Sequence, residues 1–384
     1  MSNFDALQAV HSRPTWIEVD LDALGRNFGQ LRARAGAYGA AAVMPIVKAN
    51  AYGHGLVPCA LHLARLGADA LGVAFVEEGI ALRQAGIHVP ILVLGGLVGS
   101  QIDLFLDHQL DLTVSSIAKL DAVDAQAAKR GMRARVHLKI DTGMERIGVH
   151  DYSSAAFLER AARCSHCEIV GIYSHFACAK RADHHLTVTQ LANFLAVTKR
   201  LEDLLGRRPL RHIASSGSLL AFPESSLDLV RPGVALYGVS PSRELDSILP
   251  LEPVLRLRSE VVYFKVVRAG SGVSYEHTWH APRDTRVVTI PIGYGDGYMR
   301  RLSNRGHVLI RGERYPIVGT VCMDMLMVDI GDGTAYNGDE VVLIGAQGAE
   351  RVLATELAEL AETTPHEVGT ALNHRLPRKY LGGG

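Results

Sequence analysis

The chain has 384 residues, which is enough for about two or three domains with sizeable cores. Apolar residues make up 48% and charged residues 21%, close to the average of soluble globular proteins, so the composition excludes a disordered or coiled-coil protein. Lysine and arginine (40) balance aspartate and glutamate (40), which gives a formal net charge of zero. We therefore expect neither a nucleic acid nor an anionic membrane as a partner.

The distribution of apolar residues and cysteines predicts a cytoplasmic protein. The longest apolar runs, such as residues 40–47, are far shorter than the roughly 20 residues that span a bilayer. The first 16 residues are polar and mixed, without the apolar core of a secretory leader. Five cysteines, an odd number, fit reduced thiols in a cytoplasmic setting.

Two of the cysteines, Cys164 and Cys167, form a CxxC motif around His166. A zinc site built on such a motif needs a second pair of ligands, and no other segment offers one with convincing spacing. We therefore expect these cysteines to be structural, and we expect no metal.

Eight short apolar segments alternate with helical patterns in the first part of the chain. They are rich in Val, Ile and Leu without polar alternation, as expected of strands buried on both faces. These segments are 42–48, 70–75, 90–95, 110–115, 135–141, 168–176, 210–215 and 227–233. The pattern predicts an α/β fold, a (β/α)8 barrel of the TIM type, over residues 14–245. An open doubly wound sheet is the competing fold, but no GxGxxG follows the first strand, which weakens a dinucleotide-binding version.

The pattern of predicted strands and helices changes after about residue 241. Turn clusters such as GSG, GYGDG and GDG separate strand patterns, and only one helical pattern, 354–362, is obvious. The strand patterns are 254–267, 286–292, 307–310, 315–321, 325–330 and 340–344. We expect a mostly antiparallel β domain over residues 246–384, with residues 1–13 as candidates for packing with it.

Active-site residues of a barrel lie just beyond the carboxyl ends of its strands. Lys48 follows the first strand, and a lysine in that position can form a Schiff base, because desolvation near other cations lowers its pKa. The other strand ends carry Lys139, Asp141, Arg146, His175, Ser215, Ser216 and Arg231. The segments ASSG and RPGV, after the last two strands, offer hydroxyls and backbone N–H groups for a phosphate. A lysine and a phosphate site together point to pyridoxal phosphate.

Seven motifs in order carry a resemblance to a known family. They are VKANAYGHG, KIDTGMERIG, IYSHFA, VRPGVALYG, VSYEHTW, IGYGDGY and VCMDMLMVDIG. These segments resemble the motifs of alanine racemases, and the resemblance extends over nearly the whole chain. It implies an isomerase that interconverts L- and D-alanine with pyridoxal phosphate and supplies D-alanine for peptidoglycan. It also implies a homodimer with shared active sites and a small amino acid as substrate.

The resemblance also implies a role for each matching residue. Lys48 would form the aldimine and act as one base, and Tyr275 from the neighbouring subunit would act as the other. Arg146 and the neighbour's Met323 would contact the substrate carboxylate, while Lys139, often carbamylated in the family, would orient Arg146. The phosphate contacts would be Tyr52, Ser216, Gly233 and Val234, with Arg231 facing the pyridine nitrogen and His175 linking it to the tyrosine.

The chemistry of the residues agrees with these roles. Racemisation removes the α-proton from one face and replaces it on the other, which two bases on opposite sides can do. A tyrosine normally titrates near pH 10, so it needs positive neighbours, and His175 and Arg231 could provide them. An arginine at the pyridine nitrogen stays protonated and only donates, which leaves that nitrogen unprotonated and restrains side reactions.

Three other functions compete with alanine racemisation. A pyridoxal-phosphate decarboxylase of the same scaffold would carry EPG where this chain has RPG, and a non-catalytic carrier of pyridoxal phosphate would lack the β domain. A serine or broad-specificity racemase is the alternative that the sequence separates least well.

One position departs from the family pattern. In TALNHRLPR, His374 stands where many members have a tyrosine that reaches the phosphate and narrows the site. The smaller side chain of histidine would widen this entrance to the active site, which we call the neck, so we expect measurable activity on serine. Asp324, in CMD, is expected to anchor its own loop.

Overall fold

The computed structural model describes residues 12–179 and 185–384, and these divide into two compact units. The barrel unit contains Leu24–Ala51 and Leu56–Glu252, and the β unit contains residues 12–23, Tyr52–Gly55 and Pro253–Gly384. Each unit is described by itself. Most of the N-terminal segment that we expect to pack with the β domain, residues 1–11, lies outside the described residues.

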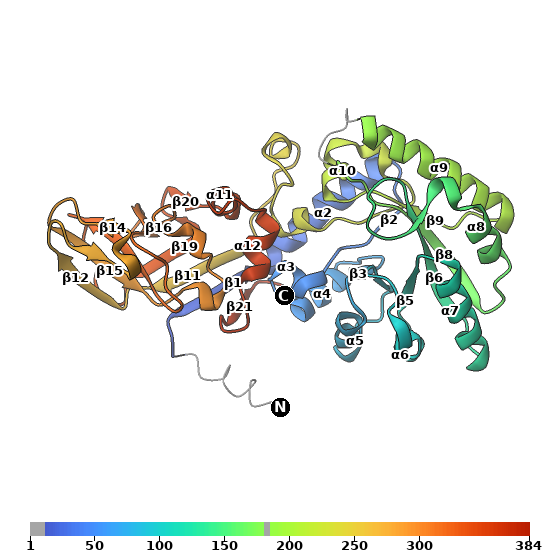
Figure 1. The fold of residues 1–384 in the computed structure, drawn as a ribbon, viewed down its shortest axis with the longest axis horizontal. Helices are drawn as coiled ribbons and strands as arrows, with labels where there is room; N and C mark the ends of the chain where they lie inside the picture. The colour runs from blue at the N-terminus through green and yellow to red at the C-terminus, as the bar shows by residue number, and fades with distance from the viewer. Residues whose placement is uncertain (1–11, 180–184) are drawn as a thin grey trace. The chain divides into compact units, whose positions relative to one another are not determined.

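Eight parallel strands form the barrel unit, as the apolar segments predict (Figure 1). Six of them hydrogen-bond in the order β3-β4-β5-β6-β8-β9, and β10 pairs with β2. Single bridges, Ile46–Gly72 and Ser215–Arg231, join the pair to both ends of the six-stranded sheet and close the ring. The strands are β2 (Ala42–Val43), β3 (Leu71–Val73), β4 (Ile91–Val93), β5 (Asp111–Val114), β6 (Ala134–Asp141), β8 (Cys167–Tyr173), β9 (Leu210–His212) and β10 (Leu229–Val230).

Helices connect successive strands and bury one apolar side each. In α7, Ser116 caps the first turn by accepting a hydrogen bond from the Lys119 N–H at 3.2 Å. Phe105, Phe157 and Phe194 from three of these helices are almost fully buried. None of the helices in the described part of the chain is long and apolar enough to cross a membrane. The helices are α2 (Leu21–Ala37), α3 (Lys48–Tyr52), α4 (Leu56–Arg65), α5 (Val76–Gln84), α6 (Ile102–Asp107), α7 (Ile117–Lys129), α8 (Ala155–Ala162), α9 (His185–Leu205) and α10 (Ser216–Ala221).

The β unit is mostly antiparallel, as its turn-rich sequence predicts. Its largest sheet has the order β17-β16-β19-β11-β1-β21, with β20 on β19, and two smaller sheets have the orders β12-β15-β18 and β13-β14. The strands are β1 (Thr15–Asp20), β11 (Leu255–Glu260), β12 (Tyr263–Val267), β13 (Gly272–Val273), β14 (Trp279–His280), β15 (Thr285–Ile290), β16 (His307–Ile310), β17 (Glu313–Pro316), β18 (Leu326–Gly331), β19 (Glu340–Gln347), β20 (Glu350–Val352) and β21 (Arg378–Leu381).

The structure differs from the sequence-based expectations in three elements. Residues 15–20, which the sequence places in the barrel domain, form β1 of the β unit, where Ile17 and Val19 are buried between β11 and β21. The single strand expected at 254–267 is two strands that belong to different sheets. A second helix, α12 (Pro365–Ala371), follows α11 (Ala354–Leu360), with Pro365 in its first turn.

Candidate active site

Lys48 begins a turn of unusual backbone conformation after β2. Ala49, Asn50 and Ala51 have φ of 53°, 56° and 52°, in the left-handed region that costs an L-residue about 1–2 kcal/mol. Hydrogen bonds hold the turn: the Ala49 N–H donates to Glu78 Oε1 at 2.6 Å, and Asn50 Oδ1 accepts from the Leu56 N–H at 2.8 Å. Strain of this kind persists only where the surroundings impose it, and it is common at functional sites.

The side chain of Lys48 lies in a positive environment. Burial lowers the pKa of its amine, and the charges of Arg146 and Arg231 lower it further, while Glu78 opposes them. The neutral amine, which is the nucleophilic and basic form, is therefore more accessible than in an ordinary lysine. The sequence analysis does not identify Glu78, which both fixes the turn and balances the charge.

Strand β6 places alternate polar side chains on one face. These are His137, Lys139 and Asp141, which occupy every second position and are all buried. Lys139 Nζ donates to the Ile140 carbonyl at 2.7 Å and lies 5.2 Å from the centre of the Tyr173 ring. Burial lowers the pKa of Lys139 to about 7, and the charge of Arg231 contributes to this shift.

Asp141 shapes the loop that carries Arg146. Its Oδ1 accepts from the N–H groups of Gly143 and Met144 at 2.8 and 2.9 Å, and its Oδ2 accepts from the Arg146 N–H at 3.2 Å. Burial alone would raise the pKa of this carboxyl, but the backbone donors outweigh it and the pKa is lowered. The loop is thus held around an ionised carboxylate, and the Arg146 side chain is exposed.

Arg231 is a buried arginine whose hydrogen bonds go to carbonyl groups and imidazoles. Its Nη2 donates to the Ser174 carbonyl at 2.8 Å and lies 3.2 Å from His175 Nδ1, and its Nη1 lies 2.9 Å from His212 Nδ1. Burial lowers its pKa to about 10, so it remains protonated at neutral pH. Because an arginine has only donors, both imidazole nitrogens must accept from it.

A chain of buried side chains continues behind Arg231. His212 Nε2 lies 2.9 Å from His137 Nδ1, and His137 Nε2 lies 3.4 Å from Asp111 Oδ2. With Arg231 as donor, His212 must be neutral and donate to His137, which in turn donates to Asp111. The chain fixes the tautomers and the position of the guanidinium. Sequence analysis misses it, although polar residues at alternate positions of a buried strand are a usable signal.

His175 lies two residues after the end of β8, and several cations surround its imidazole. Burial lowers its pKa well below the usual value, and Arg231, Arg146, Lys139 and Lys48 add to the effect in that order. The imidazole is therefore neutral at physiological pH. A neutral ring that accepts from Arg231 at Nδ1 carries its proton on Nε2.

Ser216 brings the segments after the last two barrel strands together. Its Oγ accepts from the N–H groups of Gly233 and Ala235 at 2.8 and 3.3 Å. Within the described chain, no acceptor lies in hydrogen-bonding reach of the Ser216 hydroxyl proton. The hydroxyl and the backbone at Gly233 and Val234 thus gather at one point, as a phosphate site requires.

The remaining predicted residues lie in the β unit. Tyr52 contacts His366, with ring centres 5.8 Å apart, and burial raises its pKa far above the usual value. Gly53, next to it, has φ of 87° and touches the backbone of Gly369 so closely that a Cβ would lie 2.0 Å from the carbonyl oxygen. Only glycine can fill that position.

Tyr275 stands on a strained and well-anchored turn. Its side chain is 67% exposed, and Ser274 and Glu276 on either side have φ of 66° and 60°. The Ser274 hydroxyl donates to the Thr320 carbonyl at 2.6 Å, and the Thr320 hydroxyl donates to the Tyr275 carbonyl at 3.2 Å. The turn is therefore rigid while the phenol faces outward, which agrees with the expectation of a presented loop tip.

Met323 is exposed beside a glycine-rich loop. The N–H of Gly295 donates to the Met323 carbonyl at 2.8 Å, and a Cβ on Gly293 would lie 2.2 Å from the Cys322 carbonyl oxygen. Asp324 pairs with Arg375 at 2.6 Å, which ties its loop to the C-terminal segment. His374, next to Arg375, is exposed.

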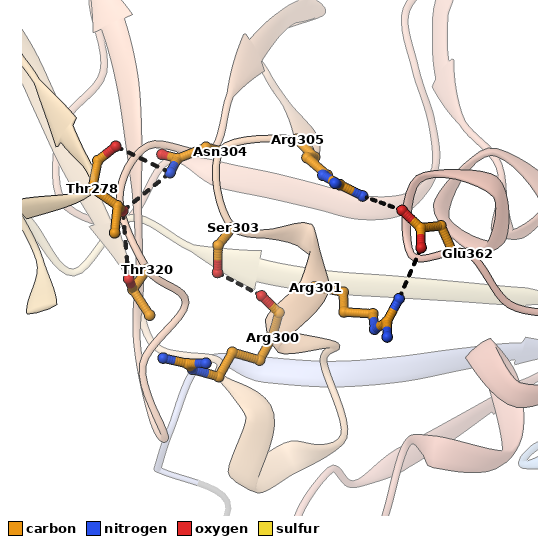
Figure 2. Close-up of a pocket in the computed structure, with 8 residues that line it drawn as sticks. All are labelled: Thr278, Arg300, Arg301, Ser303, Asn304, Arg305, Thr320 and Glu362. Carbon is orange, nitrogen blue, oxygen red and sulfur yellow. Dashed lines mark hydrogen bonds and ion pairs between the residues drawn. The ribbon is translucent and has the colours of Figure 1, made fainter. Parts of the chain in front are cut away.

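A cavity of about 420 Å³ lies beside the Tyr275 turn in the β unit (Figure 2). Asn304 Nδ2 donates to the Thr278 carbonyl and hydroxyl, which joins the cavity wall to the turn. Its lining residues are Thr278, Arg300, Arg301, Ser303, Asn304, Arg305, Thr320 and Glu362. Glu362 pairs with Arg301 and Arg305 at 3.0 and 2.9 Å, so the three arginines and one glutamate of the lining leave two excess positive charges.

A closed eight-stranded barrel with a lysine at its mouth, followed by an antiparallel β unit, defines a two-domain class of amino-acid-converting enzymes. Residues 19–241 match the family model described as the alanine racemase N-terminal domain, and residues 254–380 match the C-terminal domain. The chain belongs to the alanine racemase family. The resemblance drawn from the seven motifs is confirmed, as are the fold class and the expectation of a racemase.

Known proteins similar to this chain support the same assignment. An alanine racemase of Halothermothrix orenii is 41% identical over 376 residues, which are 97% of this chain and 99% of that protein. The structure of an alanine racemase from Streptomyces lavendulae has a TM-score of 0.93 at 38% identity and covers 97% of this chain and 98% of that one. An alanine racemase from Bartonella henselae with covalently bound pyridoxal phosphate has a TM-score of 0.86 at 29% identity, with 96% and 99% coverage.

Proposed function

We propose that this protein interconverts L- and D-alanine with pyridoxal phosphate held in the barrel unit. The observation that carries the proposal is the group at the barrel mouth: Lys48 with a lowered pKa, the buried Arg231, and the Ser216 hydroxyl beside the Gly233 backbone. The product D-alanine would serve peptidoglycan synthesis in the cytoplasm.

The residues present fit pyridoxal phosphate. Its aldehyde needs an amine that can lose its proton, and the environment of Lys48 favours that loss. Its phosphate needs converging donors, which the Ser216 hydroxyl and the backbone at Gly233 and Val234 would provide; the family resemblance adds Tyr52 to this set. The pyridine nitrogen needs a hydrogen-bond partner, and the guanidinium of Arg231 is held in place for donation by the buried chain behind it. When bound, the cofactor supplies an electron sink that acidifies the substrate α-proton.

Two residues of the chain would move that proton. Lys48 Nζ would take or give it on one face, and Tyr275 Oη on the other. Arg146, and Met323 through its backbone or side chain, would hold the substrate carboxylate. The guanidinium of Arg231 remains charged, so it would donate to the pyridine nitrogen without protonating it, which would limit competing reactions.

We propose that each complete site takes Lys48 from one subunit and Tyr275 from another. Support comes from the exposure of Tyr275 and Met323, at 67% and 52%, on a rigid surface of the β unit. A large exposed aromatic next to an exposed methionine is typical of a surface that another chain covers. A symmetric dimer would place two such surfaces over two barrel mouths.

Two experiments test this proposal. Borohydride reduction followed by peptide mapping should attach the cofactor to Lys48, and a tag on another lysine would refute the assignment. Mixing inactive Lys48→Ala with inactive Tyr275→Phe should restore part of the activity, because a mixed dimer regains one intact site. If subunit exchange is confirmed and activity does not return, both bases belong to one chain.

Serine racemisation is the second candidate, and the exposed His374 favours testing it. The wider neck expected from histidine in place of tyrosine would admit a hydroxymethyl group. Measuring racemisation of alanine, serine, lysine and arginine side by side separates a strict alanine enzyme from a broad one.

A further inference from the structure

A second cluster of reactive side chains lies at the amino ends of the barrel strands. Cys164 is in the loop after α8, Cys167 is the first residue of β8, and Asp124 is on α7. The two Sγ atoms and a carboxylate oxygen lie within 4.8 Å of one another. Strand β6 begins at this end, where the Ala134 N–H donates to the His166 carbonyl, and ends at Asp141 at the mouth. Its eight residues span roughly 25 Å, so the cluster is remote from Lys139.

We propose that Asp124, Cys164 and Cys167 form a binding site for one thiophilic divalent cation of the zinc class. Two thiolates and a carboxylate are ligands that Zn²⁺ accepts in a tetrahedral site, with water as the fourth. The CxxC loop already brings both sulfurs to one side. Atoms bound to tetrahedral zinc lie about 3.5 Å apart, and the three ligand atoms already lie within 4.8 Å of one another.

The surroundings prepare the carboxylate for this role. The His166 N–H donates to Asp124 Oδ1 at 2.8 Å, which orients the carboxylate beside the cysteines. Asp124 is only 15% exposed, and Cys167 is buried. A bound metal would thus tie α7 to the connection between α8 and β8. This site is independent of the proposed racemase reaction.

Arg160 completes the charge balance. Its Nη1 donates to Cys164 Sγ at 3.0 Å and its Nη2 donates to Asp124 Oδ2 at 3.0 Å. Two thiolates and one carboxylate carry three negative charges, and Arg160 with a divalent cation carries three positive charges. The arginine thus acts as a hydrogen-bonding neighbour that orients two of the ligands and offsets one of their three negative charges. Its other contact, Nε to Asp121 at 2.6 Å, holds it there.

The sequence alone predicts no metal here, because no second pair of ligands with suitable spacing lies along the chain. The third ligand comes instead from a helix 40 residues before Cys164, which only the fold brings into position. The expectation of no metal is replaced by this proposal.

Titration of the reduced, full-length protein with Co²⁺ under argon tests the site. We expect one equivalent to bind with a thiolate-to-cobalt charge-transfer band in the near ultraviolet, and Zn²⁺ to displace it. Zn²⁺ should also raise the melting temperature. Cys164→Ser and Cys167→Ser should each remove most of the band, whereas Asp124→Asn should weaken Co²⁺ binding roughly tenfold. Cys178→Ser, which alters a cysteine outside the cluster, should leave the titration unchanged.

Two results would overturn the proposal. The first is the absence of a charge-transfer band in the fully reduced protein, which would leave the pair with dithiol chemistry alone. The second is a band that survives Cys164→Ser with an affinity for Co²⁺ that Asp124→Asn leaves unchanged, which would place the metal elsewhere. Circular dichroism of each variant confirms its folding, and Asp124→Asn keeps the test decisive if a serine variant fails to fold.

Discussion

Lys139 should carry carbon dioxide as a carbamate. Its amine is buried among cations, which lowers its pKa to about 7. At pH 8 about nine-tenths of the amine is then neutral, against about 0.3% for an ordinary lysine, a gain of roughly 300-fold in the reactive form. The neutral amine adds to carbon dioxide and releases a proton. The product places a negative charge near Arg231 and Arg146, which the surrounding positive charges favour.

The perturbation is the removal of carbon dioxide, or Lys139→Ala. A carbamate that orients Arg146 through a charged hydrogen bond contributes about 1.5–3 kcal/mol, so either change should lower kcat/KM for alanine about tenfold to hundredfold. The modification is measured by ¹³C NMR of protein equilibrated with ¹³C-labelled bicarbonate. Occupancy should fall as the pH drops through about 7 at constant dissolved carbon dioxide, because protonation removes the reactive amine.

The control is Lys199→Ala, which removes an exposed lysine and should leave the labelled signal intact. The reasoning fails if the wild-type protein shows no carbamate signal at pH 8, or if the same signal persists in Lys139→Ala. Unchanged kinetics in protein shown to have lost the label would separate the modification from catalysis.

The remaining predictions concern three other residues. Tyr275→Phe should slow α-deuterium exchange of L-alanine by about 10²-fold or more while affecting D-alanine less; equal losses would contradict the two-base scheme. His374→Tyr should raise the alanine-to-serine ratio of kcat/KM by an amount equivalent to about 1–3 kcal/mol, and an unchanged ratio with normal cofactor binding would leave His374 a neutral substitute. Asp296→Asn should destabilise folding by about 1–3 kcal/mol in urea unfolding, because the buried carboxylate accepts both Arg13 donors at 2.9 Å and pairs with Arg375 at 3.3 Å. Asp332→Asn, which breaks an exposed ion pair, should cause no measurable change, and equal effects would refute that reasoning.

The barrel could be predicted because its strands are buried on both faces, and such strands have recognisably apolar sequences. Leu112, Val136 and Leu138 are fully enclosed, so their segments are apolar without alternation. Lys48 and Arg231 could be found because the ends of such strands define the mouth. Strand β1 could not be found, since six residues carry no information about a partner more than 200 positions away.

The site residues that the sequence did not predict were missed for one reason: their contacts are between residues far apart along the chain. Glu78 is an ordinary first-turn glutamate of α5 in the sequence, with Oε2 accepting from the Ala74 and Phe75 N–H groups, and only the left-handed turn brings the Ala49 N–H to its Oε1. His212 and Asp111 come from different strands, and their connection through His137 depends on barrel closure. Local patterns report which residues are buried, whereas these contacts are set by the fold.

The position of β1 has a consequence for the order of synthesis. This strand leaves the ribosome before the barrel, yet its neighbours β11 and β21 begin only at Leu255 and Arg378. At about 5–20 residues per second, β1 waits roughly 10–50 s for its first partner. During that interval the nascent chain carries an unpaired strand with two free hydrogen-bonding edges. The largest sheet of the β unit is therefore completed only once Arg378–Leu381 has been synthesised, and a chain interrupted before that strand would leave β1 without its parallel neighbour.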